Sequence, residues 1–552
     1  MTITPAREGL VTLDYIGVAI YLLVTVAIIA WSYRRKADTE DFFLGNRRMP
    51  WLAVGMSLLA TLLSTNSYLG VPGEIIKNGV AMFAGYLAVP LSMGVVLLVW
   101  VPFFMRLKLT SAYEYLERRF DYRVRLLAGI LFFGLRLGWI SLVTYTASMA
   151  LSRMTGVPLT TVILLVGIAA TIYTCVGGIR AVIWNDVLQF VMLFGGTFVT
   201  IGYVMWATGA GPTQWWTSIS SVATHKTSPP IFSWDITVRM TVVTAMVHTF
   251  FWTICTHGSD QVVLQRYFST ESLGAARRSY IVNAISDISV GLLLALSGLA
   301  LHYFYLQEGA VLPDGLSVDG RADEVLPYFF AHQLPAGFGG LILAGFLCDA
   351  MQTLVSGVNS ITAVATQDVF KRLFPGGKRL MKEMSLARLV TVAMGLLVTG
   401  LAFFVAQHVE HSGRNIVDLM PRMFNLFLGP LASVFLIGMF LPRCTARSTI
   451  AAVAVGLLVA VVWSWWGEIP AVCSYLGLHD TADWLVEILG RDEQGKPKTP
   501  TITLTIAIPY LTSFLLAALC GMLFDKGGEH PGRRYTWLAV MRRASENTEP
   551  TP

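Results

Sequence analysis

Long apolar stretches separated by short polar segments run along almost the whole chain. The pattern predicts about 13 helices of roughly 20 residues or more, the length that crosses the hydrocarbon core of a bilayer. We place them near residues 12–33, 50–76, 81–105, 124–153, 157–176, 184–208, 239–258, 277–305, 333–370, 385–410, 416–441, 446–467 and 501–524. The predicted fold class is therefore all-α integral membrane, without a separate soluble domain.

Composition supports this interpretation. Of the 552 residues, 55% are hydrophobic and 13% are charged, whereas soluble domains average roughly 25% charged residues. So much apolar surface cannot be hidden in one soluble core. The six cysteines are scattered without the spacing of a metal site, and nothing in the charge pattern indicates nucleic-acid binding.

Basic residues concentrate in alternate predicted loops, which fixes an orientation. Examples are "RRKADTEDFFLGNRR" (34–48) after the first helix and "KRLFPGGKRLMKE" (371–383) after the ninth. Because loops rich in Lys and Arg stay in the cytoplasm, we expect the N-terminus outside and the C-terminus inside, in a plasma membrane or a bacterial inner membrane. An odd number of spans agrees with termini on opposite sides.

The second apolar stretch changes character in its middle. "SLLATLLSTNSYLGVPG" (57–73) passes from apolar residues to the polar run 64–67 and then to Gly70, Pro72 and Gly73. A membrane helix can unwind only where protein or a water-filled cavity satisfies its backbone groups, and transporters bind ions and solutes at such breaks. The alternative is a simple kink whose hydroxyls bond back to their own helix.

Three charged residues lie deep inside predicted spans: Arg136, Asp287 and Asp349. A charge at the centre of a membrane costs about 3 kcal/mol or more, so such residues usually face a pathway or a partner. A buried salt bridge is the alternative, with Arg136 pairing with either acid. Asp349 belongs to "CDAMQTLVSGVNS" (348–360), in which Gln352 follows one helical turn later.

Six stretches in order resemble the sodium:solute symporter family, which includes the sodium–glucose and sialic acid transporters. They are "DFFLGNRRMPW" (41–51), "SLLATLLSTNSYLGVPG" (57–73), "TSAYEYLERRF" (110–120), "GGIRAVIWNDVLQF" (177–190), "SDQVVLQRYFS" (259–269) and "GPLASVFLIGMFLPR" (429–443). The resemblance extends from about Asp14 to Asp525. It implies a LeuT-type fold, in which two five-helix repeats are inverted relative to each other. The expected segments are 1–49 (extra helix and cytoplasmic loop), 50–238 and 239–445 (the repeats), and 446–552 (two extra helices and a tail).

The resemblance implies a transporter and not an enzyme. It would import a small polar solute, a sugar or sugar derivative first, by sodium-coupled alternating access. Its other partners would be membrane lipids, with no nucleic acid and no obligate protein partner. Two alternatives stay open: a proton-coupled symporter of an organic acid or amino acid, and a solute sensor that does not transport.

Site residues follow from the resemblance by position. The sodium ligands would be the carbonyls of Ala60 and Leu63 and the side chains of Asp349, Gln352 and Thr353, and a second sodium site would use Asp186 and Ser356. The solute would contact Ser64, Asn66, Ser67, Tyr68, Tyr86, Arg136 and Asp287. The family usually has small or hydroxyl residues where this chain has Asp349 and Gln352. The coupling ion at Asp349 could therefore be Na⁺ or H⁺, since a desolvated carboxylate also binds protons.

Overall fold

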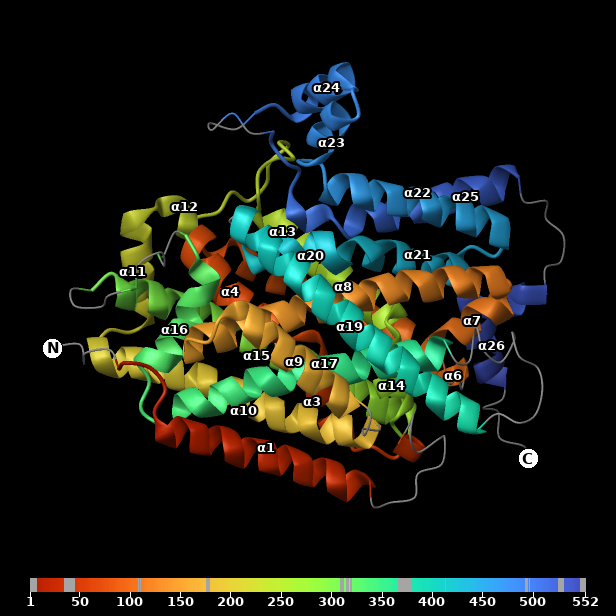
Figure 1. Ribbon diagram of the computed structural model, residues 1–552. Coiled ribbons are helices and arrows are strands. Elements are labelled where there is room, and N and C mark those ends of the chain that lie inside the picture. Colours follow the sequence, from red (N-terminus) through yellow and green to blue (C-terminus); the bar gives the residue numbers. More distant parts are fainter. Residues whose placement is uncertain are drawn as a thin grey trace.

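The protein is described by a computed structural model over residues 7–33, 45–107, 109, 111–174, 179–307, 312–313, 317, 320–365, 380–412, 414–491, 495, 497–524 and 531–546. In these residues the regular structure is helical, apart from one isolated β-bridge between Arg491 and Pro497. Most long helices run side by side in one bundle, with α1 along one face (Figure 1). The predicted all-α class is confirmed.

Each predicted apolar stretch contains helix. The helices are α1 (Thr12–Tyr33), α3 (Trp51–Leu62) with α4 (Thr65–Asn78), the run from η2 (Val80–Ala88) through α5 (Val89–Val95) and η3 (Val96–Trp100) to α6 (Val101–Leu107), α8 (Tyr122–Thr155), α9 (Leu159–Thr174), α10 (Ile179–Thr208), α13 (Val242–Ser259), α15 (Leu273–Tyr305), α17 (Phe338–Ala365), α19 (Leu380–Ser412), α20 (Ile416–Met420) with η6 (Pro421–Asn425) and α21 (Leu426–Phe440), α22 (Ala446–Ser464) and α25 (Ala507–Leu523). Among the described residues, 8 helices are long and apolar enough to cross a membrane, or 9 if one bent pair counts as a single span. A multi-pass protein is confirmed, and the number 13 stays a prediction.

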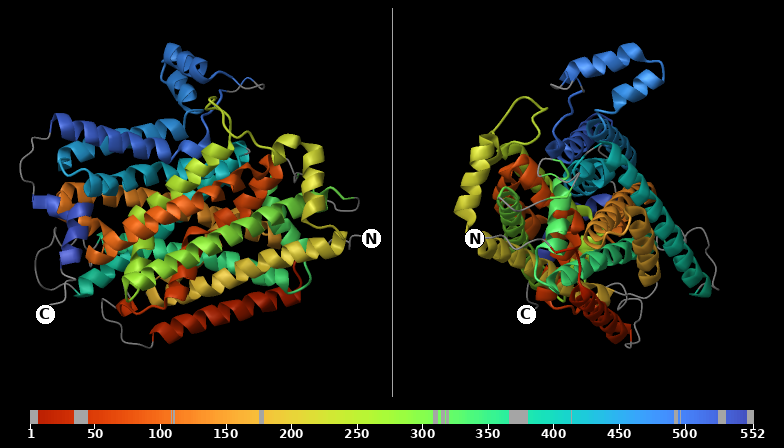
Figure 2. Two further views of the ribbon diagram at one scale, coloured as in Figure 1. Left: turned by 180° about the vertical axis from the view of Figure 1, so that it is seen from behind. Right: turned by 60° about the vertical axis from the view of Figure 1, so that its left-hand side comes forward.

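Shorter helices lie between the long ones and at the ends of the bundle. They include η1 (Gly45–Arg47), α7 (Ala112–Arg119), α11 (Pro212–Val222), α12 (Thr224–Thr227), α14 (Gln261–Phe268), η4 (Ala322–Glu324), α16 (Val325–His332), α23 (Ile469–Tyr475), α24 (His479–Leu489), η7 (Ile502–Leu504), η8 (Pro531–Tyr535) and α26 (Trp537–Glu546). Figure 2 shows α23 and α24 standing apart from the bundle. The basic stretches at 34–44 and 371–379 and the tail at 547–552 lie outside the described residues.

The predicted break in the second apolar stretch is present. The α3 helix ends at Leu62, the α4 helix begins at Thr65, and their axes differ by 60°. Leu63 between them has φ −101° and ψ 86°, far from helical values. The polar run therefore marks the interruption, as the sequence predicts.

The glycines that follow have another role than unwinding. Gly70, Pro72 and Gly73 lie inside α4, which corrects the expectation that they help to break the helix. A Cβ atom on Gly73 would lie 2.0 Å from Oδ1 of Asp323, and one on Gly70 would lie 3.3 Å from the Ile416 side chain. Gly73 must be glycine because the η4 backbone approaches it closely, and Gly70 lies in tight contact with α20.

The broken helix lies in the centre of the bundle. The α3 and α4 halves both pack against α15, α3 packs against α10, and α4 also packs against α8. The α17 helix packs against α8, α9 and α10. This arrangement brings the break next to side chains from α10 and α17. The division into inverted repeats at 50–238 and 239–445 stays a prediction.

Candidate functional site

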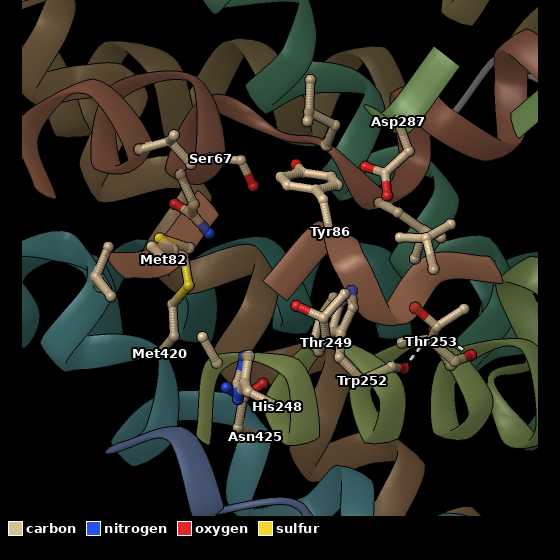
Figure 3. A pocket seen from close by; sticks show the side chains of 18 of the residues that line it. Ser67, Met82, Tyr86, His248, Thr249, Trp252, Thr253, Asp287, Met420 and Asn425 are labelled. Carbon is tan, nitrogen blue, oxygen red and sulfur yellow. Dashed lines mark hydrogen bonds between the residues drawn. The ribbon is translucent and has the colours of Figure 1, made fainter. Parts of the chain in front are cut away.

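A cavity of about 160 Å³ lies beside the start of α4. Its walls come from α3, α4, η2, α8, α13, α15, η6 and η7, and Figure 3 shows side chains from several of these elements pointing into it. The polar residues on its lining are Asn66, Ser67, Tyr86, Trp139, His248, Thr249, Trp252, Thr253, Thr256, His257, Tyr280, Asn283, Asp287, Asn425 and Thr503. The cavity is small beside the roughly 300–1,000 Å³ of typical drug-sized ligand sites, so it suits a small solute.

Four of the residues assigned to the solute from the sequence line this cavity: Asn66, Ser67, Tyr86 and Asp287. The Asn66 carbonyl oxygen accepts a hydrogen bond from Thr146 at 2.7 Å. Its amide nitrogen is buried without a partner in the described part of the chain. Figure 3 shows Tyr86 and Asp287 directed toward the same space. The structure therefore brings residues from three separate sequence regions to one place.

The other three assigned residues lie outside the cavity lining. Ser64 is buried at the break, in the residue position just before α4, and its side chain makes no capping hydrogen bond. Tyr68 is turned toward α10, and its hydroxyl donates to the Leu193 carbonyl at 3.0 Å. Arg136 forms a buried ion pair with Asp260, the residue that caps α14. This pairing corrects the expectation that Arg136 pairs with Asp287 or Asp349.

Sequence reasoning missed several lining residues on α13, α15 and η6. Thr249, Thr253 and Thr256 form a polar stripe on α13, and Asn283 lies one helical turn before Asp287 on α15. Hydroxyls repeated at spacings of 4 and 3 in an apolar helix share one face, so this signal could have been found. Asn425 has no comparable signal, because its position depends on how η6 packs against α8.

Asp349 of α17 binds the beginning of α4. Its Oδ2 atom accepts hydrogen bonds from the Thr65 backbone N–H at 2.6 Å and from the Thr65 hydroxyl at 2.5 Å. Its Oδ1 atom accepts a hydrogen bond from the Gln189 amide at 2.6 Å. The first N–H groups of a helix lack partners within the helix and carry partial positive charge. The buried carboxylate is therefore stabilised by the start of α4.

A second, much smaller cavity lies beside Asp349. It measures about 10 Å³, roughly the room of one water molecule. It is lined by Ala60, Thr61, Arg136, Asp186, Gln189, Asp349, Gln352, Thr353 and Ser356. Each residue predicted for the two sodium sites is there except Leu63, which lines the larger cavity. The Gln352 carbonyl oxygen is buried without a partner among the described residues.

The oxygen atoms on the lining of this small cavity fit a hard cation. Sodium prefers oxygen ligands, and the small cavity offers carboxylate, amide and hydroxyl oxygens. The Asp186 carboxylate is partly engaged elsewhere, since it accepts from Ser57 at 2.5 Å and pairs with Arg266 at 2.8 Å. These contacts connect α10 with α3 and α14. The assignment of individual ligands stays a prediction.

Charged residues from the segment before α13, from α4 and from α20 also meet, and Asp323 of η4, which lies outside the candidate spans, is near them. Arg239 bonds Glu74 at 2.7 Å and Asp418 at 2.6 Å. Asp323 of η4 accepts a hydrogen bond from the Ile416 N–H at 2.7 Å. Burial raises the pKa of Asp323 to about 8, and the charges of Glu74 and Asp418 act in the same direction.

An interrupted helix in the middle of a membrane bundle, with an ion-sized space at the break and a solute-sized cavity beside it, is the arrangement of a secondary transporter. The family model described as "SSF: Sodium:solute symporter family" matches residues 42–456. The chain belongs to the sodium:solute symporter family.

Similar proteins agree with this classification. The chain is 31% identical to the sodium/sialic acid symporter NanT of Aliivibrio fischeri, over 82% of this chain and 87% of that protein. It is 30% identical to the human sodium/iodide cotransporter, over 81% of this chain and 69% of that protein. A substrate-bound, outward-open structure of a Na⁺-coupled sialic acid symporter superimposes with a TM-score of 0.75 at 26% identity, covering 93% of this chain and 98% of that one. The predicted family, the LeuT-type fold and the role as a sodium-coupled transporter rather than an enzyme are confirmed.

Proposed function

We propose that this protein imports a small polar solute, a sugar or a sugar derivative, by sodium-coupled alternating access. The solute binds in the 160 Å³ cavity, in contact with Asn66, Ser67, Tyr86 and Asp287. The sodium ion binds in the small cavity beside Asp349, Gln352 and Thr353, with backbone oxygens from the end of α3. The sialic acid specificity of the bacterial relatives supports a sugar derivative as the class of solute.

The contact between Asp349 and Thr65 carries this proposal. It connects α17 to the start of α4, whose next two residues, Asn66 and Ser67, line the solute cavity. An ion bound at Asp349 therefore acts on the same half-helix that contacts the solute. This shared element gives a physical route for coupling, because both ligands favour one position of α4.

Proton coupling of an organic acid or amino acid is the second candidate. It is favoured by the carboxylate of Asp349 at a position where the family usually has small or hydroxyl residues. Against it stands the sodium dependence named for the relatives that resemble this chain. A sensor that does not transport would share the fold but would not accumulate solute.

The orientation and partners belong to the same proposal. The basic loops favour the N-terminus outside and the C-terminus in the cytoplasm, in a plasma membrane or bacterial inner membrane. The start of α1 and the α26 helix lie toward opposite ends of the bundle, which agrees with this orientation (Figure 1). Lipid is the surrounding partner, and no obligate protein partner is proposed.

Uptake by the purified protein in liposomes tests the function. The assay crosses an inward sodium gradient, a potassium gradient and a proton gradient with a panel of sugars, amino sugars, sugar acids and amino acids. We expect accumulation of at least one sugar or sugar derivative only with sodium outside. Accumulation driven by protons alone would favour proton coupling over sodium coupling. Solute binding without accumulation would indicate a sensor.

A further inference from the structure

The Asp287 carboxylate in the larger cavity has no charged partner among the residues that the structure describes. It lies in the middle of α15 (Leu273–Tyr305) and lines the cavity beside Tyr86 (Figure 3). The structure shows no hydrogen bond or ion pair to Asp287 within the described ranges. An unpaired charge inside a membrane span is expensive and usually marks a functional site. A bound cation would remove that cost.

No lysine or arginine is found among the described residues that line this cavity. Arg136 is the basic residue that the sequence offered as a partner for Asp287. Its guanidinium is paired with Asp260 instead. Two histidines are present, and both are engaged. The Nδ1 atom of His248 lies 3.1 Å from the Thr503 carbonyl, and Nδ1 of His257 lies 2.6 Å from the Tyr267 hydroxyl. An acidic solute would meet Asp287 without an Arg or Lys to balance it.

The start of α4 offers little compensation to an acidic solute. The positive end of a helix can bind a solute carboxylate, as it does in other transporters with broken helices. Here the first N–H group is bonded to Asp349, and the Ser67 and Tyr68 N–H groups are bonded to the Ser64 carbonyl at 2.9 and 3.1 Å. A carboxylate of the chain itself therefore already binds the first of the N–H groups that an acidic solute would use.

Neutral polar atoms on the lining add further hydrogen-bond acceptors. The side-chain carbonyl oxygens of Asn283 and Asn425 are buried and have no partner in the described part of the chain. An ammonium group is donor-only, so it matches a carboxylate flanked by amide oxygens. Two unpartnered donors, Asn66 Nδ2 and Trp139 Nε1, are also present. They suit a hydroxyl or carbonyl group elsewhere on the solute.

The aromatic wall fits the same chemistry. Trp139 and Trp252 are stacked with ring centroids 5.8 Å apart, and Phe424 lies 4.6 Å from Trp139. All three line the cavity with Tyr86. The Trp139 ring already has the Arg136 guanidinium 5.7 Å from its centroid, so Trp252, Phe424 and Tyr86 are the rings that a solute cation would meet. Aromatic faces attract cations by about 0.5–2 kcal/mol, more when the site is dry.

We propose that the transported solute carries a positively charged nitrogen that pairs with Asp287, and that its other polar groups are hydroxyls or carbonyls and not a carboxylate. An amino sugar or an amino alcohol has this chemistry. The inference rests on the proposed function, and it separates this chain from the sialic acid symporters it resembles, because sialic acid is itself a carboxylate.

Matched solutes test the charge preference. Glucosamine, glucose and glucuronate share a ring but are cationic, neutral and anionic, while choline and 3,3-dimethyl-1-butanol share a shape but differ in charge. Binding is measured in sodium by thermal shift, with sialic acid included. We expect a rise in melting temperature only with a cationic member, and an affinity loss of at least tenfold in Asp287→Asn, which keeps the shape of the side chain. Tight binding of glucuronate or sialic acid would overturn the proposal, as would equal binding of charged and neutral members.

A second measurement does not require the solute to be on the panel. Thr253→Cys places a thiol on the cavity lining, and Thr217→Cys places one on the exposed surface of α11 as a matched control. Each is treated with a cationic and an anionic methanethiosulfonate reagent, after subtraction of the reaction of the parent chain. We expect the ratio of cationic to anionic rates to be at least tenfold higher for Thr253→Cys, and to fall to the control ratio when Asp287→Asn is added.

The outcomes separate the two proposals. The proposal of a cationic solute is overturned if the ratio of cationic to anionic rates is equal at both thiols, or if Thr253→Cys prefers the anionic reagent. This holds even if sodium-driven uptake is found. A cationic preference that depends on Asp287 supports it even if uptake proves proton-driven. If Asp287→Asn changes the sodium dependence but leaves both charge preferences unchanged, the carboxylate belongs to the ion site and the inference is wrong.

Discussion

Single carboxylates define the chemistry of this transporter, and each has a different environment. Asp349 is held by three hydrogen bonds from Thr65 and Gln189. Asp287 has no such partners in the described residues and faces a cavity. Asp323 is buried outside the spans and accepts one hydrogen bond from the Ile416 backbone. Three aspartates thus have three different environments.

Replacing Asp349 with asparagine removes its charge and keeps an oxygen that can accept from Thr65. We expect sodium to activate uptake at concentrations at least tenfold higher, a loss of about 1.4 kcal/mol or more, with a small change in melting temperature. Uptake measured against sodium concentration checks this. Asp235→Asn, in an exposed loop, is the control. An unchanged sodium dependence would refute the assignment of the ion site.

The raised pKa of Asp323 predicts that the stability of the protein depends on pH. Its pKa is raised to about 8 in the folded protein from an ordinary value of 3.8. Between these values the folded state holds the proton more tightly than the unfolded state, so stability falls as the pH rises through this window. We expect the melting temperature in detergent to be lower at pH 9 than at pH 6, and Asp323→Asn to reduce this difference. If the variant shows the same pH dependence as the parent, Asp323 is not its source.

At the scale of elements, close contacts between helices fix the geometry of the site. Tyr86 of η2 packs over Gly291 of α15, one helical turn after Asp287. A Cβ atom at Gly291 would lie 2.0 Å from the tyrosine hydroxyl. The missing side chain of one helix therefore leaves room for a cavity residue of another. A hydropathy pattern cannot show this relation, because it concerns two segments far apart in the sequence.

The change Gly291→Ala is expected to displace the Tyr86 ring within the cavity. Solute affinity should fall by about tenfold, a loss of about 1.4 kcal/mol, while sodium binding stays near its parent value, since the proposed ion site lies between α3 and α17. Solute and sodium titrations by thermal shift measure both. Gly94→Ala is the matched control, because a Cβ atom at Gly94 would have no neighbour within 4 Å. Equal losses of solute and sodium affinity would indicate general damage to the fold rather than a shift of Tyr86.

At the scale of the whole molecule, the proposed ion and solute sites share α4. If both ligands favour the same arrangement of this half-helix, each must raise the affinity of the other by the same factor. We expect sodium to increase solute affinity five-fold or more, with a reciprocal effect of solute on sodium of equal size. Titrations of each ligand with and without the other check this equality. Affinities that do not depend on the other ligand would contradict coupling through α4.

The sequence by itself determined the membrane class, the positions of the helices, the break after Leu62, and the family. These features depend on local composition, because the bilayer requires long apolar helices and only polar residues mark an interruption. The resemblance also assigned Asn66, Tyr86 and Asp287 to the solute and Asp349 to the ion. The first three line one cavity and Asp349 lines the smaller one, while their ligands stay a prediction. Packing alone decided that Arg136 pairs with Asp260, that Tyr68 faces α10, and that Asn425 joins the cavity. The direction and partner of a side chain depend on which helix lies beside it, and that relation is set by long-range contacts that no single segment contains.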